Sequence, residues 1–184
     1  TTGVLHGWSP ISGGYSIELA IPWSNLGITP TAGMTLGFSV GYNDDDNGAG
    51  RDGQAVWIGT ANNWLDTSAF GNIVLGADMN LIAVPYTSTN LAVDGNVTET
   101  DWNIATDVSK TVIGTTNNTT TFGVLWDTTY LYVGMKVMDD TLYNDSTYVH
   151  EDDSVEIYID GDHNHGTTYD SYDRQFLKGW NDSA

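Results

Sequence analysis

The fold is decided by the stretch Tyr15-Ser16-Ile17-Glu18-Leu19-Ala20-Ile21, in which large apolar residues alternate with polar or small ones. Successive side chains of a β-strand point to opposite faces, so this alternation predicts a strand with one face in a core. The same period recurs at Leu36–Tyr42, where glycine and serine stand between the apolar residues. Both stretches therefore predict half-buried strands that cover a hydrophobic core.

The second half of the chain repeats this pattern. Strands are expected at Thr121–Trp126, Tyr130–Val137, Val155–Ile159 and Arg174–Leu177, the first two forming a hairpin around Asp127–Thr129. No window of helical length has apolar residues at helical spacing, and the nearest candidate, Pro22–Leu26, is long enough for one turn only. Many short strands separated by turn residues predict an all-β chain, folded as an antiparallel β-sandwich like immunoglobulin or jelly-roll domains.

The charge of the chain limits its partners. Its 184 residues include 24 acidic and 5 basic side chains, giving a formal net charge of -19, and no cysteine. This length suits one domain with its own core. The negative charge would repel phosphate, which argues against nucleic acid and anionic membranes, and no apolar run is long enough for membrane insertion. Without cysteine there is no disulfide, zinc–thiolate site or thiol nucleophile.

The acidic residues are concentrated in loops. One such loop is Asp44–Gly48, which is flanked by Gly50 and Asp52, and the other is Asp160–Asn164, which places oxygen ligands at alternate positions, as calcium loops do. Neither is an EF-hand, because Ala55 and Ser171 occupy the positions of the closing glutamate, and solvated acidic turns remain the alternative. The region 139–182 holds 12 of the 24 acids, whose mutual repulsion favours a bound cation. We therefore expect calcium as the cofactor.

Nothing in the sequence indicates catalysis. Some pair among 24 acids could reach the separation that a glycosidase needs, but this signal is unselective. The pair His163 and His165 offers two ligands on one loop, too few for a transition-metal site. Since no nucleophile elbow or phosphate-binding glycine loop is present, we expect a protein that is not an enzyme.

Aromatic residues suggest the kind of ligand. The chain has 7 tryptophans and 10 tyrosines, more than the core of one small sandwich needs. Trp57 and Trp64 lie outside the alternating strands expected above and are interpreted as exposed, whereas Trp23, Trp102 and Trp126 lie in or next to apolar strands and are expected in the core. Exposed aromatic faces stack on the apolar faces of sugar rings, so carbohydrate is the expected partner.

Two sets of motifs resemble the halves of a family 9 carbohydrate-binding module, in reversed order. The segments similar to its C-terminal half are Gly14–Trp23, Gly37–Val40 with Asn43 and Asp44, and Trp64–Gly71. The segments similar to its N-terminal half are Val93–Gly95 with Trp102, Val124–Asp127 with Tyr130–Val133, Asp153–Asp160, and Asp173–Phe176. The resemblance covers most of the chain and implies a β-sandwich of the kind often appended to xylanases.

The reversed order divides the chain into three parts. Residues 1–78 correspond to the C-terminal half of such a module, 79–92 to a linker or first strand, and 93–184 to the N-terminal half. Joining Ala184 to Thr1 restores the usual order, so we expect one module opened at an internal loop. A circular permutant, one period of a tandem array, and a subunit whose halves complete two neighbouring domains all fit. The last would assemble head to tail into a filament.

The resemblance also implies binding-site residues. Family members hold sugar chain ends between two tryptophan rings assisted by polar side chains. The matching positions are Trp64 for one ring, His150 for the other, and Glu156, Arg51 and Asn62 for polar contacts. Leu177 and Gly179 stand where the family has an arginine and an amide. One stacking face and one charged hydrogen bond are therefore lost, which predicts weakened sugar binding.

Structural calcium is implied in the same way. Asp139, Asp153, Asp160 and Asp173 fall in matching segments, and Asp162 belongs to the same acidic loop as Asp160. We expect a calcium-stabilised, non-catalytic, carbohydrate-binding repeat of a larger extracellular or cell-surface protein. The alternative is a structural subunit of an extracellular filament or surface layer, in which neighbouring copies are the partners and sugar binding is weakened or lost.

Overall fold

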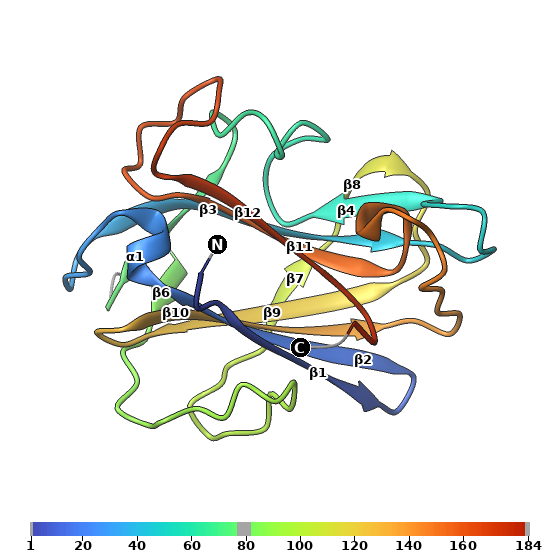
Figure 1. The fold of residues 1–184 in the computed structure, drawn as a ribbon, viewed down its shortest axis with the longest axis horizontal. Helices are drawn as coiled ribbons and strands as arrows, with labels where there is room; N and C mark the ends of the chain where they lie inside the picture. Colours follow the sequence, from blue (N-terminus) through green and yellow to red (C-terminus); the bar gives the residue numbers. More distant parts are fainter. Residues whose placement is uncertain (1, 77–81, 183–184) are drawn as a thin grey trace.

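Two β-sheets pack face to face in the computed structural model, which describes residues 2–76 and 82–182 (Figure 1). Sheet A has the order β1 (Leu5–Ile11), β2 (Gly14–Pro22), β10 (Tyr130–Met138), β9 (Thr119–Trp126), β7 (Thr106–Val108). Sheet B has the order β12 (Asp173–Gly179), β11 (Ser154–Asp160), β3 (Thr35–Asp44), β4 (Gly53–Val56), β8 (Lys110–Gly114). These pairs are antiparallel, and the predicted β-sandwich is confirmed.

Sheet B has a side branch. β5 (Gly71–Leu75) pairs antiparallel with the first half of β3, and β6 (Ile82–Val84) pairs parallel with β5. The two helical elements are single turns, α1 (Trp23–Leu26) and the 3-10 turn η1 (Val149–Glu151). Within the described ranges, no helix has the length and apolar character required to span a membrane.

All six predicted strands and the predicted helical turn are confirmed. They correspond to β2, β3, β9, β10, β11 and β12, and to α1. α1 starts directly after Pro22 and ends at Gly27, whose left-handed backbone (φ 69°) suits glycine. Strands β1, β4, β5, β7 and β8 were not predicted, and β6 lies within residues 79–92, which were expected to form a linker or a first strand.

The core forms from the inward-facing residues of the alternating strands. Representative members are Ile17 of β2, Val40 of β3 and Ile157 of β11, all fully buried. Trp23 and Trp126 lie in this core as expected, and Trp102 packs against a smaller cluster on the outer face of sheet A. The expectation that Trp57 offers a free face is wrong. Its ring packs against Phe38 and Phe122 at centroid distances of 6.2 and 5.5 Å.

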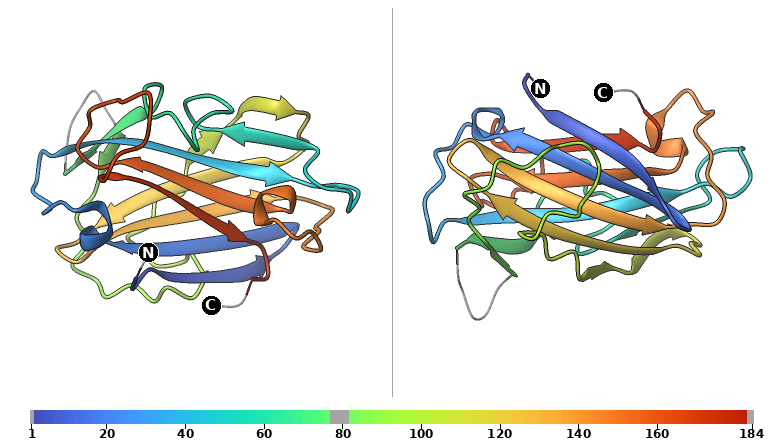
Figure 2. Two further views of the ribbon diagram at one scale, coloured as in Figure 1. Left: turned by 45° about the horizontal axis from the view of Figure 1, so that its top comes forward. Right: turned by 90° about the horizontal axis from the view of Figure 1, so that it is seen from below.

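The first and last parts of the chain interleave in both sheets. β2 pairs with β10 along its whole length, and β3 pairs with β11. On one side of the sandwich, Trp8 of β1 meets Trp180, just after β12, edge to face at 5.8 Å, where the edge strands of the two sheets come together (Figure 2). One core therefore depends on both parts of the chain. The predicted boundary at residues 78 and 79 lies outside the described residues.

Candidate functional site

A cavity of about 580 Å³ opens on the outer face of sheet B. Its floor consists of side chains that alternate with the core residues of β4, β11 and β12, and its rim comes from the loops after β3, β4 and β10. All five residues predicted to contact sugar line it: Arg51, Asn62, Trp64, His150 and Glu156, together with Gln54, Ala61, Ile113, Gln175 and Leu177. We call it the sheet B cavity.

Trp64 is the exposed aromatic face of this cavity, with 56% of its surface accessible. It is carried by a tight turn in which Leu65 N–H donates to Asn62 O at 2.9 Å. The buried Asn63 holds the turn, since its Oδ1 accepts Thr60 N–H at 2.8 Å and its Nδ2 donates to Ile58 O at 3.1 Å. The indole is therefore presented on a fixed backbone, which favours stacking on a flat ligand.

His150 lies on η1, at the position where the family's second ring is expected. Its ring is 5.7 Å from that of Tyr148, with the two planes inclined by 30°. Tyr148 is 60% exposed and was not predicted as a site residue. Leu177 lines the cavity, so its alkyl side chain stands where a charged donor was expected from the resemblance.

Glu156 organises the floor. Its side chain is buried, and its Oε1 accepts Asn43 Nδ2–H at 2.7 Å and Gln54 Nε2–H at 3.3 Å. Its Oε2 accepts Gln175 Nε2–H at 2.8 Å and the hydroxyl of Tyr158. Burial, followed by the nearby Glu156 carboxylate, raises the pKa of Tyr158, which keeps this hydroxyl a donor.

Arg51 is connected to Glu156 indirectly, through Asn43. Its Nη1 donates to Asn43 Oδ1 at 3.0 Å, and Asn43 in turn donates to Glu156. The cavity thus combines one exposed indole with fixed donors and acceptors, which is the composition expected of a site for a polyhydroxylated ring.

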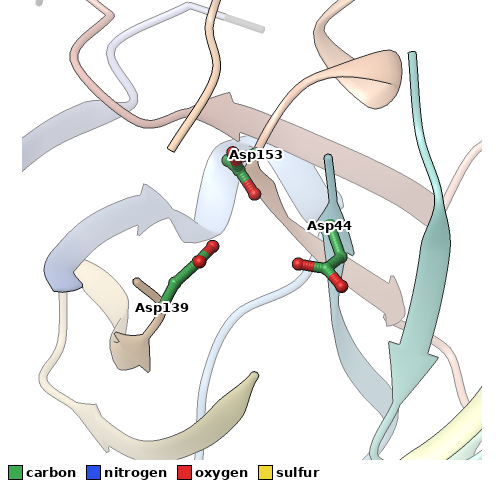
Figure 3. A group of neighbouring side chains, drawn as sticks. All are labelled: Asp44, Asp139 and Asp153. Carbon is green, nitrogen blue, oxygen red and sulfur yellow. The ribbon is translucent and has the colours of Figure 1, made fainter. Parts of the chain in front are cut away.

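Three buried aspartates form the first acidic cluster: Asp44 at the end of β3, Asp139 just after β10 and Asp153 just before β11. Their carboxylates point toward one another (Figure 3), and one potential ligand atom from each lies within 4.8 Å of the others. Burial, with repulsion from Asp139, raises the pKa of Asp153 to about 8. Burial, with repulsion from Asp46 and Asp139, raises the pKa of Asp44 to about 6.

Further polar atoms around the first cluster lack partners. Asp44 Oδ2 is buried without a hydrogen bond among the described residues, and so is the hydroxyl of Tyr15. Burial raises the pKa of Tyr15 well above its usual range, and the charges of Asp153, Asp139 and Asp44 add to it. Buried carboxylates that repel one another and leave an oxygen unpaired fit a hard divalent cation such as calcium.

The second acidic cluster joins Asp160, Asp162 and Asp173 at the ends of β11 and β12. Asp160 accepts Asn164 N–H at 3.2 Å and His165 N–H at 2.9 Å. Burial, with repulsion from Asp160, raises the pKa of Asp173 to about 6, and its Oδ1 is buried without a partner among the described residues. The five predicted calcium ligands therefore lie in two separate clusters, Asp139 and Asp153 in the first and the other three in the second.

The acidic loop also places two histidines. The rings of His163 and His165 lie 4.6 Å apart, and the Nε2 atoms of both lie against Asn72 Oδ1, at 2.9 and 3.1 Å. Their contacts tie the loop after β11 to β5.

Two further groups of aspartates were not predicted from the sequence. One joins Asp46 and Asp140, both exposed, to Asp139 of the first cluster. The other, Asp45, Asp145 and Asp152, forms a third acidic cluster with a similar spacing of ligand atoms. Asp44, named in an acidic loop and in a segment similar to the family but not as a calcium ligand, belongs to the first cluster. The signal in the sequence was the two Asp-Asp pairs, Asp44-Asp45 and Asp152-Asp153. Consecutive side chains can serve two neighbouring sites, but only the fold shows which residues meet.

Comparisons with known proteins identify relatives. The chain is 32% identical over 166 residues to endo-1,4-beta-xylanase A of Thermoanaerobacterium saccharolyticum, covering 89% of this chain and 14% of the relative. It is 32% identical over 166 residues to exoglucanase XynX of Acetivibrio thermocellus, covering 89% of this chain and 15% of the relative. A match to endo-1,4-beta-xylanase A of Thermotoga maritima reaches 41% identity over 66 residues, which are 35% of this chain and 6% of that protein. No solved structure gave a significant match.

The chain therefore spans only a small part of each of these curated relatives. A family model described as "Carbohydrate family 9 binding domain-like" matches two segments, residues 1–77 and 93–184. These segments contain the strands of both sheets except β6, and every residue predicted for the sheet B cavity. The chain belongs to the carbohydrate family 9 binding domain-like family.

Proposed function

We propose that this chain is a non-catalytic, calcium-stabilised, carbohydrate-binding domain of a larger extracellular protein. The observation that carries the proposal is the sheet B cavity, where the five residues expected from the family resemblance line one surface. Those residues lie far apart in sequence, from Arg51 to Glu156, so their meeting in one cavity is a property of the fold.

Each part of the cavity has a role in this proposal. The exposed face of Trp64 stacks on the apolar face of a sugar ring, and His150 backed by Tyr148 supplies a smaller second face. Gln175 and Gln54, which Glu156 holds in place, and Asn62 on the rim offer hydrogen bonds to hydroxyl groups. Because Leu177 offers no charged donor, we expect weak binding, in the range of high micromolar to millimolar dissociation constants, on the order of −4 to −6 kcal/mol.

Calcium would be held by carboxylates in the first and second acidic clusters. The ion supplies charge neutralisation at sites where Asp44, Asp153 and Asp173 otherwise repel their neighbours. The two clusters join the ends of β3, β10, β11 and β12, so a bound ion would stabilise the folded chain and not the unfolded one.

The names and lengths of the relatives support the proposal that this domain is part of a larger extracellular protein. The matched proteins are named xylanases and an exoglucanase, and this chain corresponds to 14% and 15% of the first two. Xylan and glucan are polymers, so we propose that the whole protein meets its polysaccharide outside the cell and that any catalysis lies in other parts of the protein.

The proposal is tested by affinity electrophoresis in gels containing xylan, β-glucan or no polysaccharide. Retardation by one polymer is expected, and it should be lost in Trp64→Ala. Tyr86→Ala is the matched control, since Tyr86 is 53% exposed and packs on Trp126 away from the cavity. Free migration of the wild type in every polysaccharide, or equal retardation of Trp64→Ala, contradicts the proposal.

A second candidate function is self-assembly by exchange of the two parts of the chain. The observation that favours it is the pairing of β2 with β10 and of β3 with β11, which joins segments 1–77 and 93–184. The same pairings could form between copies, and an exchange that does not close yields a filament. Light scattering after refolding at high and low protein concentration tests this, and a monodisperse monomer at both concentrations contradicts it.

A further inference from the structure

The turn that carries Trp64 is held from outside the sheet B cavity by the loop that joins β11 to β12. We define the Trp64 turn as residues 60–67 and the β11–β12 loop as residues 161–172. The two segments lie side by side, although 99 to 106 positions of the chain separate the residues in contact (Figure 2). Among the described residues, those that line the cavity include none from this loop. The loop therefore acts on a bound ligand through the Trp64 turn.

Tyr169 makes the shortest contact between the two segments. Its hydroxyl donates to the backbone carbonyl oxygen of Asn63 at 2.6 Å, directly before Trp64. Burial, followed by the charges of Asp173 and Glu156, raises the pKa of Tyr169, so the hydroxyl stays protonated and remains a donor. Asn63 is 1% exposed. Tyr169 thus supplies a hydrogen bond to a buried carbonyl oxygen that would be costly to leave unpaired.

Thr67 joins the far end of the turn to the same loop. The carbonyl oxygen of Gly166 accepts both the N–H and the hydroxyl of Thr67, each at 3.0 Å. The ring Nδ1 of His165 lies 3.3 Å from Thr67 O. Thr67 is fully buried, so these contacts are shielded from water. The turn is therefore fixed on both sides of Trp64, at Asn63 and at Thr67.

The β11–β12 loop is itself held in place. Asn164 Oδ1 accepts Gly166 N–H at 2.8 Å, and Asn164 Nδ2–H donates to Asp170 Oδ2 at 2.7 Å. The Nε2 atom of His165 lies 3.1 Å from Asn72 Oδ1 on β5. Because the loop is fastened both internally and to a strand, it can serve as a support for the turn that rests on it.

We propose that Tyr169 is a positioning residue of the carbohydrate site, whose hydroxyl fixes the Trp64 turn so that the indole faces the sheet B cavity before a sugar binds. This inference rests on the proposed function of that cavity. Trp64 is 56% exposed, so its own packing restrains the ring little and the backbone of the turn sets where the ring lies. A ring that is fixed in advance loses less entropy on binding, so the loop contributes to affinity without touching the ligand.

Tyr169→Phe removes the hydroxyl and keeps the ring. Calorimetric titration, in a calcium-containing buffer and with oligosaccharides of the polymer that retards the wild type, should show binding about threefold to tenfold weaker, the effect of one lost hydrogen bond. Amide hydrogen exchange should become faster at Leu65 and Thr67, whose N–H groups donate to Asn62 O and Gly166 O. The heteronuclear NOE of the Trp64 indole N–H should fall, since the ring becomes more mobile.

Tyr132→Phe is the matched control. Tyr132 is a buried tyrosine of sheet A, outside the cavity lining, and its hydroxyl donates to Asp127 Oδ2 at 2.8 Å. Urea unfolding should show a loss of stability in both variants, because each loses a hydrogen bond. Affinity, exchange in the Trp64 turn and the NOE of the Trp64 indole should change only in Tyr169→Phe.

Equal affinity in Tyr169→Phe and the wild type overturns the inference, and so does an equal loss of affinity in the two tyrosine variants. Exchange at Leu65 and Thr67 that is unchanged in Tyr169→Phe also overturns it, whether or not a sugar binds. If no polysaccharide binds the wild type, the proposed function fails. Faster exchange in Tyr169→Phe would then show that the hydroxyl supports the turn, but its role in carbohydrate binding would be overturned together with the function.

Discussion

The carboxylate of Glu18 on β2 accepts the backbone N–H of Gly95 at 2.8 Å, joining residues 77 positions apart in the chain. The same side chain accepts Asp94 N–H at 3.1 Å and Trp102 Nε1–H at 3.1 Å. Glu18 therefore fastens the start of the second family segment to the outer face of sheet A. Its burial raises its pKa to about 7, despite the hydrogen bonds that oppose the shift.

The raised pKa of Glu18 predicts a pH dependence of stability. Because the folded pKa of about 7 exceeds the ordinary glutamate pKa of 4.5, the folded state binds the proton more tightly, and this contribution to stability is lost as pH rises between those values. In EDTA, the melting temperature should therefore fall less steeply with pH over this window in Glu18→Gln than in the wild type. Parallel melting curves for the two proteins across the window would contradict the assignment.

Calcium removal should destabilise the chain most at alkaline pH. At pH 8.5 the aspartates of the first cluster are largely ionised, since the pKa values of Asp153 and Asp44 are about 8 and about 6. At pH 5.5 protons neutralise them and replace part of the effect of the ion. Each site saturated at a hundred times its dissociation constant contributes about 2.7 kcal/mol, which raises the melting temperature by roughly 5–10 °C.

Calorimetric melts with calcium and with EDTA at both pH values check this prediction. The shift caused by EDTA should be larger at pH 8.5 than at pH 5.5. A melting temperature indifferent to EDTA at pH 8.5 would show that the acidic clusters hold no stabilising ion.

Replacing Leu177 with arginine should strengthen sugar binding. Leu177 lines the sheet B cavity and is 36% exposed, so a longer side chain has room to reach a ligand. A hydrogen bond from a charged group contributes about 1.5–3 kcal/mol, which corresponds to a gain of about tenfold to a hundredfold. Leu65→Arg, at a leucine 44% exposed and outside the cavity lining, controls for the added charge. Calorimetric titration with oligosaccharides measures the affinity of each variant. An equal increase in affinity in both variants would indicate nonspecific attraction and contradict the prediction.

Substitutions at two glycines with similar φ angles should distinguish the cost of backbone strain from the cost of a steric clash. Gly95 has φ 88°, and a Cβ there would lie 2.2 Å from Trp8 C, whereas Gly33 has φ 85° and no atom within 4 Å of such a Cβ. Gly33→Ala should cost about 1 kcal/mol from the left-handed backbone alone. Gly95→Ala should cost several times more, because the backbones of β1 and the Asp94–Gly95 turn must move apart. Urea unfolding measures both, and equal losses would contradict the close approach.

Much of the sandwich was predictable, because its central strands alternate residues that face the core with residues that do not. In β2 and β3 the second set is small or polar throughout, and in β10 and β11 it also includes Tyr132 and Tyr158. β1 escaped prediction because Gly7 and Pro10 interrupt its pattern. The reason for Gly7 is tertiary, since a Cβ there would lie 2.5 Å from Asp94 C. No local pattern reveals such a contact.

Some residues of the candidate sites could also be predicted from the sequence, whereas others could not. Trp64 and Glu156 could be placed by family resemblance, and their shared cavity agrees with that placement. The third acidic cluster could not, because it depends on the pairing of Asn43 with Ser154, which aligns the end of β3 with the start of β11. That register brings Asp45 and Asp152 together across more than one hundred residues. The division of the chain at residues 78 and 92 stays a prediction.

Carbohydrate binding in the sheet B cavity is tested most directly by an NMR titration of the ¹⁵N-labelled chain with oligosaccharides of the polymer that retards it in the gels. We expect saturable shifts of the Trp64 indole N–H and of the Gln54, Asn62 and Gln175 side-chain amides, with the Trp8 and Trp180 indoles unchanged. Shifts confined to residues outside the cavity, or no shifts at millimolar ligand, would contradict it.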